Sequence, residues 1–141
     1  EAGEWLDQDK EQFRLVPIPM TSAWGIALNW EWGYAGIDPT YYLLRRSLTN
    51  IMEANGLENL IWKYMTSSSV GDLDRIKNLL PFLNAKYIVV HKDAARDYFN
   101  IDKGAYDQSV INLELGVSCL KMEKSFGELY FYKLDEYKDY F

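Results

Sequence analysis

The sequence predicts an α/β (α+β) fold, in which a mixed sheet of about four strands and its flanking helices form a two- or three-layer sandwich. Three observations support this prediction. A nearly continuous apolar run over residues 86–90 is typical of a strand that is covered on both faces. An amphipathic helical pattern over residues 72–83 leads into this run. Two alternating segments near the carboxyl end, separated by Phe126-Gly127, indicate a β-hairpin.

The first part of the chain predicts a short helix followed by a strand. Residues 3–10 are mostly polar, and Trp5 and Leu6 can anchor a short helix there. Residues 13–19 alternate between apolar and other residues and include two prolines, so we expect a strand near an edge of the sheet, because proline donates no backbone hydrogen bond. Residues 20–38 hold three glycines and only two charged residues, and we expect a long connection.

Three helical segments are expected before the buried strand. Asp38-Pro39 is a favourable helix start, and apolar residues at helical spacing follow it up to an Asn-Gly pair. A second helix is predicted over residues 57–65. The third helix begins at a capping Asp72 and is bent or ended by Pro81. Its apolar stripe comprises Leu73, Ile76, Leu79, Leu80 and Leu83.

The remaining elements follow the buried strand. Residues 93–99 fit one or two helical turns, and a short helix is expected around residues 107–114. The strands of the hairpin are predicted over residues 119–124 and 128–134.

The length and composition predict a single soluble domain over residues 1–141. The 141 residues are enough for one core and too few for two. The chain has 48% hydrophobic and 26% charged residues, which is ordinary for a globular domain. Because the sequence begins without Met and ends on Tyr140-Phe141, we expect a domain excised from a larger protein.

The charge of the chain disfavours nucleic acid as a partner. The net charge is −6 and the pI about 4.8, whereas a phosphate-binding face needs clustered Lys and Arg. The longest basic run is Arg45-Arg46. This pair could hold a phosphate group, although such pairs more often form a solvated helix face.

No catalytic residue, metal site or cofactor is predicted. Cys119 and His91 are the only residues of their types, so neither an intrachain disulfide nor a zinc site of the usual kind can be assembled. We expect Cys119 to be a buried thiol and His91 to have a structural or surface role. No phosphate-binding loop or nucleophile elbow is present, so a stand-alone enzyme is the least favoured interpretation.

An aromatic-rich segment over residues 24–42 is the candidate ligand-binding region. Trp30, Trp32 and Tyr34 alternate, so they would share one face of an extended chain. The rings could fill the core, form a surface for glycans or lipid headgroups, or dock on a membrane-embedded partner, and the first is the most frequent role for such rings. The carboxylates in this segment could cap loops or, less often, act in acid–base chemistry. The candidate residues are Trp24, Trp30, Glu31, Trp32, Tyr34, Asp38, Tyr41 and Arg45.

Four short motifs occur in a specific order along the chain. They are the FRLVP strand at 13–17, the GIDPTYY segment at 36–42, the LLPFLNAKYIV segment at 79–89 and the FGELYFYKL segment at 126–134. Together they resemble the extracytoplasmic domain of YfhO-like and related polytopic membrane proteins of the GT-C glycosyltransferase superfamily.

The resemblance implies an accessory role. In such proteins catalysis is attributed to loops between membrane helices, which act on a sugar donor linked to a lipid phosphate, so no catalytic residue is assigned to this chain. We expect an extracytoplasmic domain, attached to the cell membrane through its parent protein, that contacts an acceptor glycan, a lipid-linked sugar or the membrane-embedded remainder of the parent. The alternative is a purely structural or protein-interaction module without a ligand. Whether the parent is an active glycosyltransferase stays open.

Overall fold

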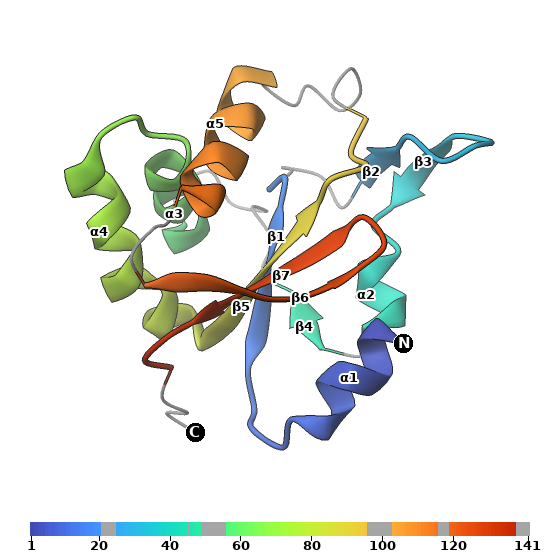
Figure 1. Cartoon of the computed structure of the whole chain (residues 1–141), viewed down its shortest axis with the longest axis horizontal. Coiled ribbons are helices and arrows are strands. Elements are labelled where there is room, and N and C mark those ends of the chain that lie inside the picture. Colours follow the sequence, from blue (N-terminus) through green and yellow to red (C-terminus); the bar gives the residue numbers. More distant parts are fainter. Residues whose placement is uncertain (21–24, 45, 49–55, 96–102, 116–118, 138–141) are drawn as a thin grey trace.

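A mixed sheet of five strands forms the centre of the molecule (Figure 1). The computed structural model describes residues 1–20, 25–44, 46–48, 56–95, 103–115 and 119–137. The sheet confirms the predicted mixed sheet of about four strands and adds a very short fifth one. Its strands are β1 (Arg14–Ile18), β4 (Ser47–Leu48), β5 (Ala85–His91), β6 (Leu120–Phe126) and β7 (Leu129–Leu134).

The strand order is β4-β1-β5-β7-β6. The strands β4, β1 and β5 run parallel to one another, and β7 and β6 join them as an antiparallel hairpin. Within the described residues, β4 pairs with Arg14 and Leu15, and no described strand lies beside Pro17 on that side of β1. This placement agrees with the prediction of a proline-containing strand near an edge.

Helices cover both faces of the sheet, so the predicted sandwich has three layers (Figure 1). The longer helices α3, α4 and α5 contribute to the larger core, and the short helix α1 lies over the opposite face. The helical elements are α1 (Ala2–Gln8), α2 (Thr40–Leu43), α3 (Leu57–Met65), α4 (Val70–Leu79), the 3₁₀ turn η1 (Leu80–Leu83) and α5 (Lys103–Glu114).

Alternation along the central strand separates two apolar cores. Ile88 and Val90 face the larger core with residues of α3, α4 and α5, whereas Tyr87 and Val89 face a smaller core with Leu6 of α1. All seven residues of β5 are buried. The prediction of a strand covered on both faces is therefore confirmed.

The turn that leads into β5 confirms the role expected for Pro81. The helix α4 ends at Leu79, and the 3₁₀ turn that follows contains Pro81. Asn84 then adopts the left-handed conformation, with φ 51°, and its side-chain amide donates to the carbonyl of Gln12. This local reversal delivers the chain directly into the sheet at Ala85.

The expected long connection over residues 20–38 contains a small antiparallel sheet instead. Its strands are β2 (Gly25–Leu28) and β3 (Tyr34–Ile37). The reversal between them is closed by a hydrogen bond from the Gly33 amide to the carbonyl of Trp30, and Gly33 has φ 67°. A backbone bridge between Leu28 and Ala94 fastens this hairpin to the segment after β5. The alternating aromatic residues suggested one extended segment, but Trp30 and Trp32 lie in or beside the turn between the two strands.

Three helix predictions need correction. The helix expected to run from Asp38-Pro39 to the Asn-Gly pair ends at Leu43, and β4 then joins the open side of β1. Ser69, and not Asp72, occupies the capping position of α4. Of the helical turns predicted over residues 93–99, only residues 93–95 are described, and they form a turn and a bridge. In the first case a tertiary partner outweighed local propensity.

The remaining helices and the carboxyl-terminal hairpin agree with the sequence. The helix α3 matches its predicted range, and α5 begins four residues earlier than expected. Gly127, with φ 57°, occupies the first position of the two-residue turn between β6 and β7.

Removing side-chain volume from the central strand should destabilise the fold strongly. We expect Ile88→Ala to lower the free energy of unfolding by about 3 kcal/mol, because the side chain is fully buried and its loss leaves a cavity. Urea denaturation measures the effect. The matched change Ile111→Ala, at a half-exposed position of α5, should cost less than about 1 kcal/mol. Equal losses would show that β5 is not the centre of the core.

Candidate functional site

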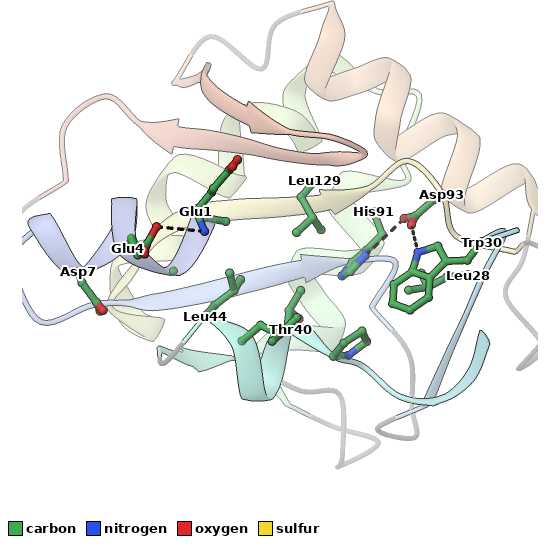
Figure 2. A pocket seen from close by; sticks show the side chains of 14 residues that line it. Glu1, Glu4, Asp7, Leu28, Trp30, Thr40, Leu44, His91, Asp93 and Leu129 are labelled. Atoms are coloured by element: carbon green, nitrogen blue, oxygen red, sulfur yellow. Dashed lines mark hydrogen bonds and ion pairs between the residues drawn. The ribbon is translucent and has the colours of Figure 1, made fainter. Parts of the chain in front are cut away.

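A cavity of about 450 Å³ lies between the two short helices and the carboxyl end of β5 (Figure 2). Its volume is within the range of small-molecule sites. One part of the wall is acidic, another is apolar, and the side chains of His91, Asp93 and Trp30 lie together on one side (Figure 2). The lining residues are Glu1, Ala2, Gly3, Glu4, Asp7, Leu28, Trp30, Pro39, Thr40, Leu43, Leu44, His91, Asp93 and Leu129.

His91 is the last residue of β5 and lies between two carboxylates. The side chain is almost completely buried, with a residue exposure of 2%. Its Nε2 lies 3.3 Å from Oδ2 of Asp38, and its Nδ1 lies 3.7 Å from Oδ1 of Asp93. Asp38 lies between β3 and α2, and Asp93 follows β5. The histidine therefore links the connection between β3 and α2 to the end of the central strand.

The two carboxylates set the charge of the imidazole. Burial alone would disfavour the charged ring, but Asp38 and Asp93 outweigh it and raise the pKa of His91 to about 9. For each carboxylate, burial also opposes the charge, and the interaction with His91 outweighs it, so the pKa values of Asp38 and Asp93 are lowered. At neutral pH the three groups form a carboxylate–imidazolium–carboxylate cluster with one net negative charge.

Pro39, and not Asp38, occupies the capping position of α2, but Asp38 accepts two hydrogen bonds at the start of this helix. One oxygen, Oδ1, accepts the backbone amide of Thr40 at 2.8 Å and the Thr40 hydroxyl at 2.6 Å. The other oxygen faces His91. Since Thr40 donates its hydroxyl hydrogen to Asp38, this hydroxyl is not arranged as a nucleophile activated by the histidine.

Trp30 is held in a fixed orientation at the rim of the cavity. Its Nε1–H donates to Oδ2 of Asp93 at 2.7 Å. Its ring packs against that of Tyr34, with centroids 5.1 Å apart and planes inclined by 37°. Trp30 remains 47% exposed, so an oriented aromatic surface borders the buried charged cluster.

The structure brings together only part of the predicted ligand-binding set. Trp30 lines the cavity, and Tyr34 and Asp38 lie behind the lining, in contact with Trp30 and His91 respectively. Glu31 and Trp32 lie in the turn between β2 and β3, and Trp32 is 91% exposed. Tyr41 lies half-buried on α2 and does not line the cavity. Trp24 and Arg45 lie outside the described residues.

The expectation that the loop aromatics fill the core is wrong for Trp30 and Trp32, which are exposed. The two tryptophans also do not share a face of one strand, because the chain reverses between them. Arg46, the neighbour of Arg45, is neither on a solvated helix face nor open to a phosphate. Its guanidinium donates to the carbonyls of Leu6 and Asp9.

Sequence reasoning missed His91 as part of a site. Its predicted structural role fits its burial, but the cavity and the two carboxylates beside it were not foreseen. The signal was the His91-Lys92-Asp93 sequence directly after the apolar run of residues 87–90, where polar side chains follow at the end of the strand. Cys119 is a buried free thiol, as predicted, and burial raises its pKa. Across the described part of the chain, no three His, Cys, Asp or Glu side chains are placed to hold a metal ion together.

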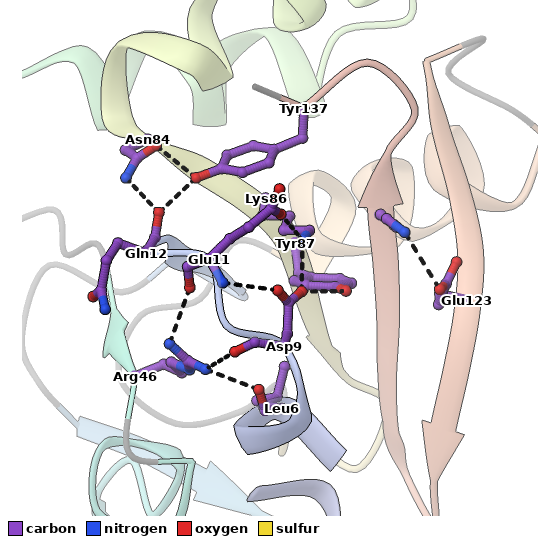
Figure 3. A network of polar contacts seen from close by, with 11 residues as sticks. Leu6, Asp9, Glu11, Gln12, Arg46, Asn84, Lys86, Tyr87, Glu123 and Tyr137 are labelled. Carbon is purple, nitrogen blue, oxygen red and sulfur yellow. Dashed lines mark hydrogen bonds and ion pairs between the residues drawn. The ribbon is translucent and has the colours of Figure 1, made fainter. Parts of the chain in front are cut away.

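A second charged cluster lies at the opposite end of β5 (Figure 3). The ammonium of Lys86, with a side-chain exposure of only 7%, is paired with Asp9 at 2.5 Å and with Glu11. It also lies over the rings of Phe13 and Tyr137. Burial disfavours the ammonium, but the two carboxylates outweigh it and raise the pKa of Lys86. With rings and carboxylates on all these sides, the cluster is structural.

Comparison with known proteins shows the fold alone. No protein-family model matches the sequence, and no curated protein matches it either. The crystal structure of the C-terminal globular domain of oligosaccharyltransferase from Archaeoglobus fulgidus is similar, with a TM-score of 0.53, 9% sequence identity and coverage of 94% of both chains. The likeness is one of fold, and the YfhO-like subfamily is not confirmed.

Within the described residues, no helix is both long and apolar enough to cross a bilayer.

The stability of the protein should depend on the charge of His91. The folded-state pKa is about 9 and the unfolded value is 6.5, so the stabilisation is complete below pH 6.5 and is lost as the pH rises through 9. Urea denaturation across this range should show the fall. The imidazole NMR signals, which are unambiguous because the chain has one histidine, should titrate near pH 9. In His91→Gln, the fall in stability around pH 9 should be absent. A titration of the imidazole near pH 6.5 in the folded native protein would contradict the ion-pair cluster.

Replacing Lys86 tests whether the second cluster is structural. We expect Lys86→Met to lower the free energy of unfolding by about 2 kcal/mol, because the two carboxylates lose their buried cation. Lys121→Met removes a cation from an exposed pair with Asp135 and should cost less than about 1 kcal/mol. If both variants lose the same stability, the Lys86 cluster contributes no more than a surface ion pair.

Proposed function

We propose that this chain is an accessory, extracytoplasmic domain of a membrane-bound glycosyltransferase-like protein. The observation that carries the proposal is the fold shared, over 94% of both chains, with the C-terminal globular domain of an oligosaccharyltransferase. The ordered sequence motifs support the same assignment independently of the structure. In this proposal the catalytic groups lie in the membrane-embedded remainder of the parent protein, and the domain contacts an acceptor glycan or that remainder.

The cavity supports contact with a glycan. It combines an oriented, half-exposed tryptophan with the carboxylates of its wall, which is suitable for the apolar face and the hydroxyl groups of a sugar ring. The site lies at the carboxyl end of β5, where the sheet ends and side chains from separate segments converge.

A second candidate function is a structural or protein-interaction module without a ligand. It is favoured by exposed apolar side chains on the hairpin and on α2, which are Trp32, Ile37, Tyr42 and Leu43. Exposed apolar surface is typical of protein or membrane contacts where it forms a contiguous patch. The glycan-contacting domain needs the cavity, whereas the interaction module needs this exposed apolar surface.

The test uses the protein that carries this chain. The proposal expects multiple membrane-spanning segments beside residues 1–141, and a protein without them contradicts it. In membranes that contain this protein, deletion of residues 1–141 should reduce sugar transfer from a lipid-linked donor at least about tenfold, with unchanged amounts of protein in the membrane. Unchanged transfer after deletion would contradict an accessory role.

Two point variants separate the candidate functions in the same membranes. If the cavity acts, Trp30→Ala should reduce transfer and the surface change Tyr42→Ser should not. If the domain only docks on the membrane part, Tyr42→Ser should release it from cross-links to that part, whereas Trp30→Ala should have little effect. Both side chains are exposed, so neither change removes a buried core residue.

A further inference from the structure

Two residues that line the cavity, His91 and Asp93, carry polar atoms that the protein leaves without hydrogen bonds. Both ring nitrogens of His91 and the Oδ1 oxygen of Asp93 are buried and make no hydrogen bond with the protein. Buried polar groups without such partners are uncommon and destabilising. The 3.7 Å between Nδ1 and Oδ1 is too long for a direct hydrogen bond. Both atoms are closed to solvent, so a ligand hydroxyl reaches them only if the Asp93 side chain rotates. The hydroxyl can then accept a hydrogen bond from Nδ1–H of His91 and donate one to Oδ1 of Asp93.

The walls of the cavity restrict the charge of a ligand. Glu1, Glu4, Asp7 and Asp93 line it with four carboxylates. The positive groups at the described wall are the His91 imidazolium and the Glu1 amino group, which is already paired with Glu4. Asp38, directly behind the imidazolium, cancels much of its field. The excess of negative charge would therefore repel a ligand with a carboxylate or phosphate. It would not repel a neutral ligand or one with an amine.

The shape of the cavity favours a flat-faced ligand with hydroxyl groups. The Trp30 ring stands at the rim, fixed by its hydrogen bond to Asp93 and by its packing on Tyr34. Leu43 and Leu129 supply apolar surface. The volume of about 450 Å³ is in the range of cavities that hold small ligands.

We propose that this cavity is a sugar-binding site that selects a pyranose ring without negative charge. The ring stacks on Trp30, and one hydroxyl bridges Asp93 and His91. The proposal deepens the proposed function, on which it rests, by naming the binding residues and the class of sugar. The exposed face around Trp32 is not part of this site, because Trp32 does not line the cavity.

The proposal is tested by NMR titration of the 141-residue chain with four probes. Methyl glucoside and glucosamine are the non-acidic sugars, glucuronate is the acidic sugar, and ethanolamine is an amine without a sugar ring. The chain has five tryptophans, and the indole N–H signal of Trp30 is identified by its loss in Trp30→Phe. We expect saturable shifts of this signal and of the His91 signals with methyl glucoside or glucosamine, with a dissociation constant on the order of 1 mM. Glucuronate should bind at least about tenfold more weakly because of the acidic wall.

Matched variants locate the binding. Asp93→Asn should weaken it at least about tenfold, because a charged hydrogen-bond acceptor is lost, whereas Asp74→Asn, the same change on the exposed face of α4, should leave it within about twofold. Trp30→Ala should abolish binding and Trp32→Ala should not. The Trp30 and Trp32 variants keep the test decisive if Asp93→Asn fails to fold, since both rings are exposed.

Three results would overturn the proposal. The first is the absence of a saturable shift with both methyl glucoside and glucosamine. The second is an affinity for glucuronate equal to that for methyl glucoside. The third is a response to ethanolamine without a response to methyl glucoside, which would indicate an amine site. Each is distinguishable from failure of the proposed accessory role, because that role is measured by deleting the domain from the membrane protein and does not require a sugar in this cavity.

Discussion

The complete burial of β5 is the constraint on which the rest of the structure depends. This strand is paired on both edges and covered on both faces, so none of its seven residues reaches solvent freely. Two of them nevertheless carry cations, Lys86 near its start and His91 at its end. A buried charge is tolerated only where opposite charges and hydrogen bonds replace water. The fold therefore has to bring carboxylates to both ends of the strand.

These charge requirements explain how the connecting segments are arranged. At the start of β5, the segment between α1 and β1 supplies Asp9 and Glu11, and Arg46 binds backbone carbonyls of the same region. At the end of β5, the connection between β3 and α2 supplies Asp38. The two short helices α1 and α2 are thus positioned by ion pairs as well as by the few apolar side chains that they bury. The cavity is the space that remains between them.

Sequence patterns predicted the elements whose stability is local or strongly periodic. The apolar run of β5, the stripe of α4 with its end at Pro81, and the hairpin around Gly127 each follow from spacing and turn chemistry. The strand β4 was missed because it forms by pairing with β1, which is distant in sequence. The hairpin β2–β3 pairs locally, but the tryptophans in its turn concealed it, and a backbone bridge from Leu28 to Ala94 fastens it to a distant segment. The site was only partly predictable for the same reason as β4. Trp30 and Asp38 belong to a recognisable segment, but Trp30 binds Asp93 and Asp38 pairs with His91, and both partners are distant in sequence.

The two ends of β5 meet the same electrostatic requirement in different ways, and the difference is the strongest argument for a site. Lys86 forms close contacts with both of its carboxylates and lies against aromatic rings, so its polar group is satisfied by the protein alone. His91 is as deeply buried, yet its nitrogens make no hydrogen bond and a cavity adjoins it. A purely structural cluster gains nothing from this looser arrangement, since a buried polar atom without a hydrogen bond costs about 1–3 kcal/mol. A binding site does gain, because a ligand hydroxyl can then complete the hydrogen bonds that the protein leaves open.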